Sequence, residues 1–128
     1  MPPVFLGLDE VIEIHRDQID HYGGRAGIRD MALLQSAVTM PQASFSGEYL
    51  HTDIFEMAAA YLFHIVQNHP FVDGNKRVGA VAALVFLVLN GVKERVPNRA
   101  LVETVLAVAQ GKIGKSAAAE FFRRHSRH

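Results

Sequence analysis

The sequence contains no cysteine, no net charge and no long hydrophobic run. Without cysteine the protein can form neither disulfide bonds nor thiolate metal sites, which fits the reducing cytoplasm. The 13 lysine and arginine residues balance the 13 aspartate and glutamate residues, so no overall charge indicates direct binding to nucleic acid or to an anionic membrane. We therefore expect a cytoplasmic protein that does not bind nucleic acid directly.

The hydrophobic segments are too short to place the protein in a membrane. The most apolar of them, residues 78–89, falls short of the roughly 20 residues of a membrane span. The N-terminus lacks the basic start and the long apolar run of a signal peptide. No internal repeat, low-complexity tract or linker divides the sequence, so we expect residues 1–128 to form a single domain without a membrane partner.

Apolar residues recur with a helical period along almost the whole sequence, which predicts an all-α fold of about six helices. The segments 53–68 and 75–90 are apolar almost all round, so we expect two helices buried in the middle of the domain. Residues 41–51 have no helical period and are expected to form an exposed loop or a small hairpin. The other helices are predicted over residues 9–21, 30–39, 98–110 and 117–124.

Several residues are expected to mark helix ends. Gly23 and Gly24 end the first helix, because glycine adopts the left-handed conformation without strain. Asp53 and Glu56 have the spacing of a capping box at the start of the first central helix. Ser116 is expected to be the N-cap of the last helix, and residues 125–128 to form a frayed basic tail.

A polar motif, His69-Pro-Phe-Val-Asp-Gly-Asn-Lys-Arg77, joins the two central helices. Polar groups beside a core are costly unless they are paired, so the presence of this polar cluster between two buried helices needs an explanation. Gly74 allows the backbone to turn and to approach a ligand closely, and the next residues begin a helix whose free N–H groups and dipole form a phosphate site. Lys76 and Arg77 add positive charge suited to phosphate oxygens.

The same motif contains candidates for the remaining parts of a phosphate-transfer site. Asp73 can hold a Mg²⁺ ion that bridges phosphate oxygens. His69 can take a proton from an attacking hydroxyl, since histidine titrates at about pH 6.5. Phe71 is expected to point into the core and to anchor the loop. We therefore assign catalysis to His69, Asp73, Lys76 and Arg77, and nucleotide binding to Phe71, Gly74, Asn75, Lys76 and Arg77.

The motif resembles the signature His-Pro-Phe-x-Asp/Glu-Gly-Asn-Gly-Arg of the Fic/Doc superfamily. It is most similar to the version in death-on-curing (Doc) toxins, in which the last Gly is Lys. The resemblance extends over nearly the whole chain and includes Tyr22-Gly-Gly24, Gly27-Ile-Arg-Asp30 and Leu89-Asn-Gly91. It implies a compact helical bundle around two central helices, with a flap at residues 41–51 on which a target protein is laid in extended form.

Two departures from the Fic pattern favour the Doc activity. Fic AMP-transferases have Gly at the position of Lys76 and usually a second Arg at the position of Ala80. The resemblance to Doc implies transfer of the γ-phosphate of ATP to a Ser/Thr hydroxyl, with Mg²⁺ as the metal. It also implies that the target is a translation elongation factor, that the outcome is growth arrest, and that a small antitoxin neutralises the protein.

Three alternatives stay open at this point. A Fic-type AMP-transferase would use the same loop with the nucleotide reversed. A catalytically silent nucleotide- or partner-binding module is the second alternative, because Val81 stands where Doc proteins of the phage type carry a polar Asn. The third is that the motif residues only cap two helices and form surface ion pairs.

Three weaker signals concern residues outside the motif. His64 is expected to be a hydrogen-bonded core histidine, since its spacing from His69 does not suit a zinc pair. His15 is expected either to approach the active site or to be a packed structural residue. Ser116-Ala-Ala-Ala-Glu120 resembles the inhibitory helix of self-inhibited Fic proteins, but helix capping by Ser116 explains it better.

Overall fold

The two apolar segments that flank the motif form adjacent helices in the middle of the protein. In the computed structural model, which describes residues 2–127, these are α3 (Ile54–Asn68) and α4 (Asn75–Leu89). Most of their side chains are buried, which agrees with their lack of a polar face. Gly79 lets them pack closely, because a Cβ there would lie 3.3 Å from the backbone oxygen of Leu62. Together α3 and α4 form the centre of the core.

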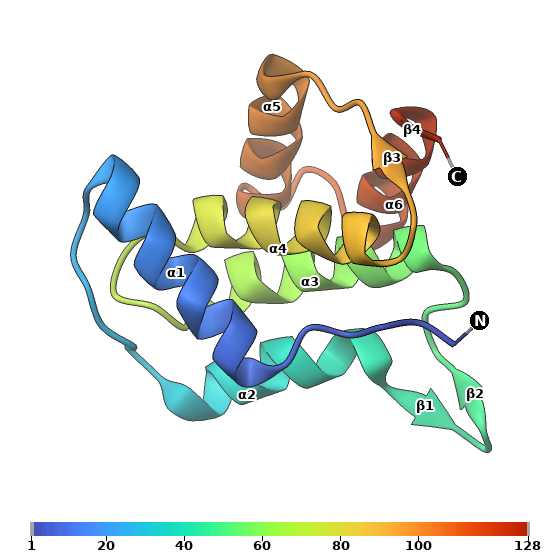
Figure 1. The fold of residues 1–128 in the computed structure, drawn as a ribbon, viewed down its shortest axis with the longest axis horizontal. Helices are drawn as coiled ribbons and strands as arrows, with labels where there is room; N and C mark the ends of the chain where they lie inside the picture. Colours follow the sequence, from blue (N-terminus) through green and yellow to red (C-terminus); the bar gives the residue numbers. More distant parts are fainter. Residues whose placement is uncertain (1, 128) are drawn as a thin grey trace.

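Four further helices surround this central pair (Figure 1). Helix α1 (Leu8–Tyr22) packs against α4, while α2 (Met31–Thr39) and α6 (Lys115–Arg124) pack against α3, and α5 (Asn98–Ala109) contacts both central helices. A 3-10 turn, η1 (Met40–Gln42), follows α2. The prediction of an all-α bundle of about six helices around two buried ones is confirmed.

Two pairs of very short antiparallel strands complete the fold. Strands β1 (Ser44–Phe45) and β2 (Glu48–Tyr49) form the small hairpin expected within residues 41–51. Strands β3 (Lys93–Glu94) and β4 (Ser126–Arg127) pair near the C-terminus, and the Arg95 amide donates to the His125 carbonyl. The prediction of a frayed tail is therefore wrong for residues 125–127, and His128 lies outside the described residues.

Two details of helix capping differ from the sequence predictions. Gly114, not Ser116, is the N-cap of α6, because the Gly114 carbonyl already accepts from the Ala118 amide at 3.2 Å. Asp53 caps α3 as expected, with Oδ1 2.8 Å from the Glu56 amide nitrogen. The Glu56 carboxylate, however, accepts from the Thr52 amide and hydroxyl rather than from Asp53. Only half of the expected capping box forms.

The hairpin is not placed where a flap would be useful. It lies beside the start of α3, whereas the motif follows the end of α3 (Figure 1). Fifteen helical residues separate the two ends, a distance of about 22 Å at 1.5 Å per residue. A target laid on residues 41–51 would be far from His69, so the prediction of a flap in this segment is wrong. The segment that lies against the motif is the linker between α1 and α2.

No helix within residues 2–127 has both the length and the hydrophobicity needed to cross a membrane.

A cluster of one lysine and two histidines ties α6 to the rest of the fold. Lys115 Nζ, at the start of α6, lies 3.2 Å from Nε2 of His64 and 3.2 Å from Nε2 of His51. His64 is on α3, and His51 follows the hairpin. Both imidazoles must be neutral to accept from the ammonium group. His64 is the hydrogen-bonded histidine that was expected, although it is half-buried rather than fully buried.

This cluster predicts a loss of stability in mildly acidic solution. Burial, with a further contribution from Lys115, lowers the pKa of His64 to about 4, and burial also lowers the pKa of His51. Unfolded histidines titrate at about 6.5, so below this value the unfolded chain takes up more protons than the folded chain. The stabilisation is therefore present at pH 7 and is lost as the pH falls through 6 toward 4.

The urea midpoint of unfolding should be lower at pH 5 than at pH 7. His64→Gln keeps an acceptor for Lys115 but cannot titrate, so it should reduce this difference. Carboxylates contribute little in this window, because their reference pKa values are about 4. An equal pH dependence in the variant and the wild type would contradict the assignment.

Candidate active site

The motif loop, residues 69–74, is fixed by the residue that begins α4. Asn75 is buried, and its side-chain amide bonds both peptide groups of Phe71: Oδ1 accepts from the amide and Nδ2 donates to the carbonyl, each at 3.0 Å. The Phe71 ring has no exposed surface. Phe71 anchors the loop as expected, and both side chains support the site from beneath rather than facing the solvent.

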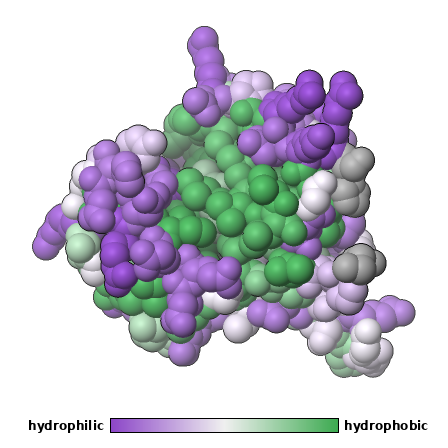
Figure 2. All heavy atoms as spheres, in the orientation of Figure 1, coloured by the Kyte–Doolittle hydropathy of each residue, from purple (hydrophilic) through white to green (hydrophobic). Residues whose placement is uncertain are grey.

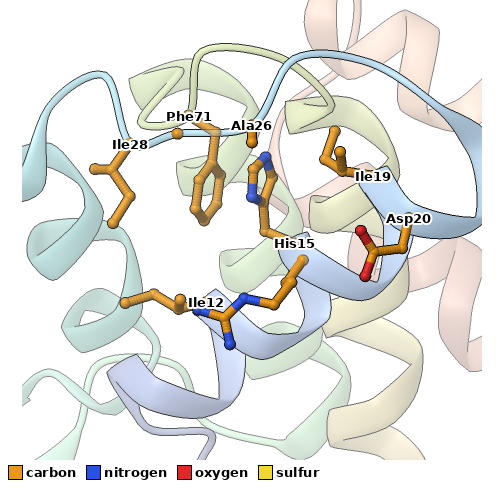
Figure 3. A pocket seen from close by; sticks show the side chains of 9 residues that line it. Ile12, His15, Ile19, Asp20, Ala26, Ile28 and Phe71 are labelled. Atoms are coloured by element: carbon orange, nitrogen blue, oxygen red, sulfur yellow. The ribbon is translucent and has the colours of Figure 1, made fainter.

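His15 of α1 supports the loop from the same side. Its ring stacks on Phe71, with the centroids 3.9 Å apart, and its Nε2 lies 2.9 Å from the Asp73 carbonyl oxygen. Since a carbonyl only accepts, Nε2 carries the proton. Figure 3 shows this pair beside a hollow of about 290 Å³ that Ile12, Ile19, Ala26 and Ile28 also line. His15 therefore approaches the loop from behind, as a packed and hydrogen-bonded residue.

The α1–α2 linker, residues 23–30, runs alongside the motif loop. Ile28 and Phe71 form an antiparallel bridge, in which the Arg29 amide donates to the Pro70 carbonyl at 2.7 Å and the Val72 amide to the Gly27 carbonyl at 3.0 Å. The Arg29 side chain also donates to the carbonyls of Asn68 and His69. Sequence analysis missed these contacts, although Gly27-Ile-Arg-Asp30 was among the segments that resemble the family.

Asp73 is an exposed carboxylate held by two backbone amides. Oδ2 accepts from the Arg25 amide at 3.1 Å, and Oδ1 accepts from the Gly74 amide at 2.8 Å. These hydrogen bonds, with a smaller contribution from Arg77, lower the pKa of Asp73. The carboxylate is therefore ionised at neutral pH, with lone pairs left for a cation.

Asp73 suits Mg²⁺ only as one ligand among several. Within residues 2–127 no group of three histidine, aspartate or glutamate side chains could hold a metal ion by itself. Mg²⁺ commonly binds one or two carboxylates and completes its shell with phosphate and water oxygens. The donor set therefore fits a metal ion that arrives with a phosphate ligand.

One hollow of about 440 Å³ brings the motif residues together. His69, Asp73, Gly74, Lys76 and Arg77 all line it. Its remaining lining residues are Val66, Asn75 and Ala109. The first amides of α4 have no partner within the helix, and Gly74 reaches the required turn with φ 81°. The hollow thus combines a histidine, an ionised carboxylate, two cations and a helix N-terminus.

Arg77 is partly committed to the linker. Its Nη2 donates to the Gly23 carbonyl at 2.8 Å, and its guanidinium lies 5.8 Å from the Tyr22 ring centroid. Lys76, by contrast, is exposed. Arg77 is therefore a preorganised cation beside the helix start, whereas Lys76 can turn toward a ligand.

Comparison with known protein sequences identifies the family. The sequence model of the Fic/DOC family matches residues 5–87. The chain belongs to the Fic/DOC family. The protein named "Protein kinase doc" from Escherichia phage P1 is 34% identical over 116 residues, which cover 91% of this chain and 90% of the phage protein. The protein named "Toxin Doc" from Mycolicibacterium smegmatis is 43% identical over 72 residues, covering 56% of this chain and 55% of that protein.

The linker explains why the family resemblance includes the Tyr22-Gly-Gly24 segment. Gly24 has φ 116°, and a Cβ at this position would lie 2.9 Å from Asp73 Oδ2 and 3.3 Å from Arg77 Nη2. Gly23 has φ 82°, but a Cβ there would meet nothing within 4 Å. Both glycines relieve backbone strain, and only Gly24 makes room for the site.

Gly24→Ala should therefore displace the Asp73 carboxylate. Losing one hydrogen bond to a charged group, about 1.5 kcal/mol, should weaken the Mg²⁺-dependent ATP binding that the family resemblance implies about tenfold. Gly23→Ala is the matched control, because it adds the same methyl group in a similarly strained conformation without the clash. Titration calorimetry with and without Mg²⁺ measures the effect, and equal affinities in the two variants would contradict it.

Proposed function

We propose that this protein is the toxin of a toxin–antitoxin system, a Doc-type kinase that transfers the γ-phosphate of ATP to a Ser/Thr hydroxyl of a translation elongation factor. The observation that carries the proposal is the single hollow in which His69, Asp73 and Lys76 meet at the N-terminus of α4. The relatives named as a kinase and as a toxin support the activity and the biological role.

Four motif side chains have a part in this reaction. His69 takes the proton of the attacking hydroxyl while its oxygen forms a bond to the γ-phosphorus. The bond from that phosphorus to the bridging oxygen breaks, and ADP leaves. The first amides of α4, with Lys76 and Arg77, bind the phosphate oxygens. Asp73 would hold Mg²⁺, which neutralises phosphate charge when it is bound.

The AMP-transferase is the second candidate, and the surroundings of Lys76 favour the kinase over it. Ala80 is almost fully buried and supplies no second cation one turn into α4. Lys76 is instead the free cation at the mouth of the hollow. Val81, which stands where a polar residue was expected, lines an apolar groove beside Lys76 and not the hollow itself. The phosphate cradle therefore does not use this side chain directly.

The same groove is the proposed docking site of the antitoxin. It lies between α1, α4 and α5 and is about 260 Å³ in volume; its apolar lining is Ala80, Val81, Leu101, Val102, Val105 and Leu106. Figure 2 shows a hydrophobic area over α4 between more polar surfaces. Lys76 and Arg77 line the same groove, so an amphipathic helix placed there would cover the phosphate-binding cations.

Charge and topology indicate a separate chain as the inhibitor. Glu10, Glu13 and Asp17 of α1 border the continuation of the groove along α4, which favours a partner helix with basic residues. The Ser116–Glu120 segment does not line the groove: it belongs to α6, which packs against α3, and Arg123 of this helix forms an ion pair with Asp53 at the start of α3. An internal inhibitory helix is therefore not formed by this segment.

The position of the transferred label tests the reaction. The protein is incubated with a cell extract and with ATP labelled at the α- or the γ-phosphate. We expect protein-bound label only from γ-labelled ATP, and none with His69→Ala. Label only from the α-phosphate would replace the kinase by the AMP-transferase. If neither label is transferred and the wild type behaves like His69→Ala, the silent binding module is favoured.

Growth assays test both the proposed role as a toxin and the proposed docking of the antitoxin in the groove. Expression should arrest growth, and co-expression of the small protein encoded alongside should relieve the arrest. Val102→Arg should keep the arrest but lose the relief, because it places a charge in the apolar groove opposite a basic partner. Val88→Arg is the matched control, since Val88 is 59% exposed and Val102 is 56% exposed, but Val88 lies outside the groove. Equal relief of both variants would argue against this docking site.

A further inference from the structure

His69 has a backbone conformation that is unfavourable for two separate reasons. Its φ of 49° and ψ of 53° are left-handed, which is costly for a residue with a Cβ. The following residue, Pro70, also disfavours helical conformations at the residue before it. Among the non-glycine residues of the described chain, only Ser46 in the hairpin turn shares a positive φ. Such a conformation persists where the surrounding structure holds it in place.

Arg29 is the residue that holds it. Three consecutive carbonyl groups at the end of α3 accept hydrogen bonds from this one residue. Nη2 donates to the Asn68 carbonyl at 2.9 Å, and Nε donates to the His69 carbonyl at 2.6 Å. The backbone amide of Arg29 donates to the Pro70 carbonyl at 2.7 Å. The backbone of Arg29 is itself held by the hydrogen bond to the Pro70 carbonyl. Ordering the Arg29 side chain from this fixed backbone therefore costs less conformational entropy.

These contacts fix both backbone angles of His69. The Asn68 carbonyl belongs to the peptide plane before the His69 Cα, and the His69 carbonyl belongs to the plane after it. A peptide group is planar, so holding its oxygen restrains the whole plane. Two planes held by one rigid, planar guanidinium leave φ and ψ of His69 little freedom. These two angles set the direction in which the Cα–Cβ bond of His69 leaves the backbone, and so limit where its imidazole can lie.

The end of α3 is also joined directly to the start of α2. Asn68 Nδ2 donates to the Leu33 carbonyl at 3.0 Å, and Asp30, the neighbour of Arg29, caps α2 through the Leu33 amide. The end of α3 and the start of α2 are thus joined on both sides of His69. The restraint on His69 is part of the helix packing and does not depend on a ligand.

We propose that Arg29 is a positioning residue for His69, which keeps the base directed into the phosphate hollow. This inference rests on the proposed function, because it assumes that His69 takes the proton of the attacking hydroxyl. Arg29 itself does not line the hollow. It acts through the His69 backbone and should affect the chemical step more than nucleotide binding.

Arg29→Gln tests this proposal in the γ-phosphate transfer assay. A misplaced catalytic group can cost about 100-fold in rate, so kcat should fall by about this factor. KM for ATP should change by less than about threefold, because the residues that bind phosphate are untouched. Arg29→Lys keeps the charge but loses the planar fork, so its kcat should be intermediate. A raised KM with unchanged kcat would show a binding role and overturn the proposal.

Arg99→Gln is the matched control for loss of one surface arginine. Arg99 lies at the start of α5, its side chain is 93% exposed, and its one ion pair within residues 2–127 is with Glu103 at 3.4 Å. Its kcat should equal that of the wild type, and a shared loss would overturn the positioning role. Urea unfolding of each variant verifies that activity is measured on folded protein. If Arg29→Gln does not fold, Arg29→Lys decides the test by the same criteria.

A second measurement needs no substrate. The His69 imidazole signal in the NMR spectrum, assigned by its loss in His69→Ala, should be sharp in the wild type and broadened or split in Arg29→Gln. If the wild type transfers no phosphate but the His69 signal differs between the wild type and Arg29→Gln, the proposed function is wrong. The restraint of His69 by Arg29 is then still supported. An unchanged His69 signal in the folded variant would overturn the inference, whatever the activity.

Discussion

The buried amide of Asn75 is the interaction on which the site depends. It is almost fully buried, and both of its polar atoms bond the peptide groups of Phe71. A buried polar group is costly unless its hydrogen bonds are made, so these two bonds tie the loop to the first turn of α4. The Phe71 ring is held in turn by His15. The first amides of α4, which we propose to bind phosphate, therefore start from a backbone that these contacts already fix.

The central helices set the distance across this site. Gly79 lets α4 approach the backbone of α3 closely, so the end of one helix and the start of the other lie around the same hollow. The residue at the end of α3 is His69, and the first turn of α4 carries Lys76 and Arg77, the cations that we propose to bind phosphate. Phosphoryl transfer needs positioned charges and a placed base, and rigid helix ends supply both.

The α1–α2 linker holds the acidic and the basic side chains of the site in place. Its Arg25 amide holds the Asp73 carboxylate ionised, its Gly23 carbonyl holds Arg77, and its Arg29 binds the end of α3. Asp73 and Arg77 are thus each held by a backbone group of the linker, and Arg77 contributes to the lowered pKa of Asp73. The hairpin lies beside the start of α3, and neither its residues nor the Lys115 cluster line the hollow.

The sequence by itself determined the helices, the two buried segments and the motif, because helical period, glycine and proline act locally. It also determined that Phe71 anchors the loop and that Gly74 makes the turn. Only the tertiary structure decided which segment covers the motif: the linker does, through bonds that join residues 40 and 48 positions apart, and residues 41–51 do not. It likewise decided the pairing of β3 with β4 and the sharing of Lys115 by two histidines. Such contacts depend on how helices pack and close long loops, and no local pattern encodes that geometry.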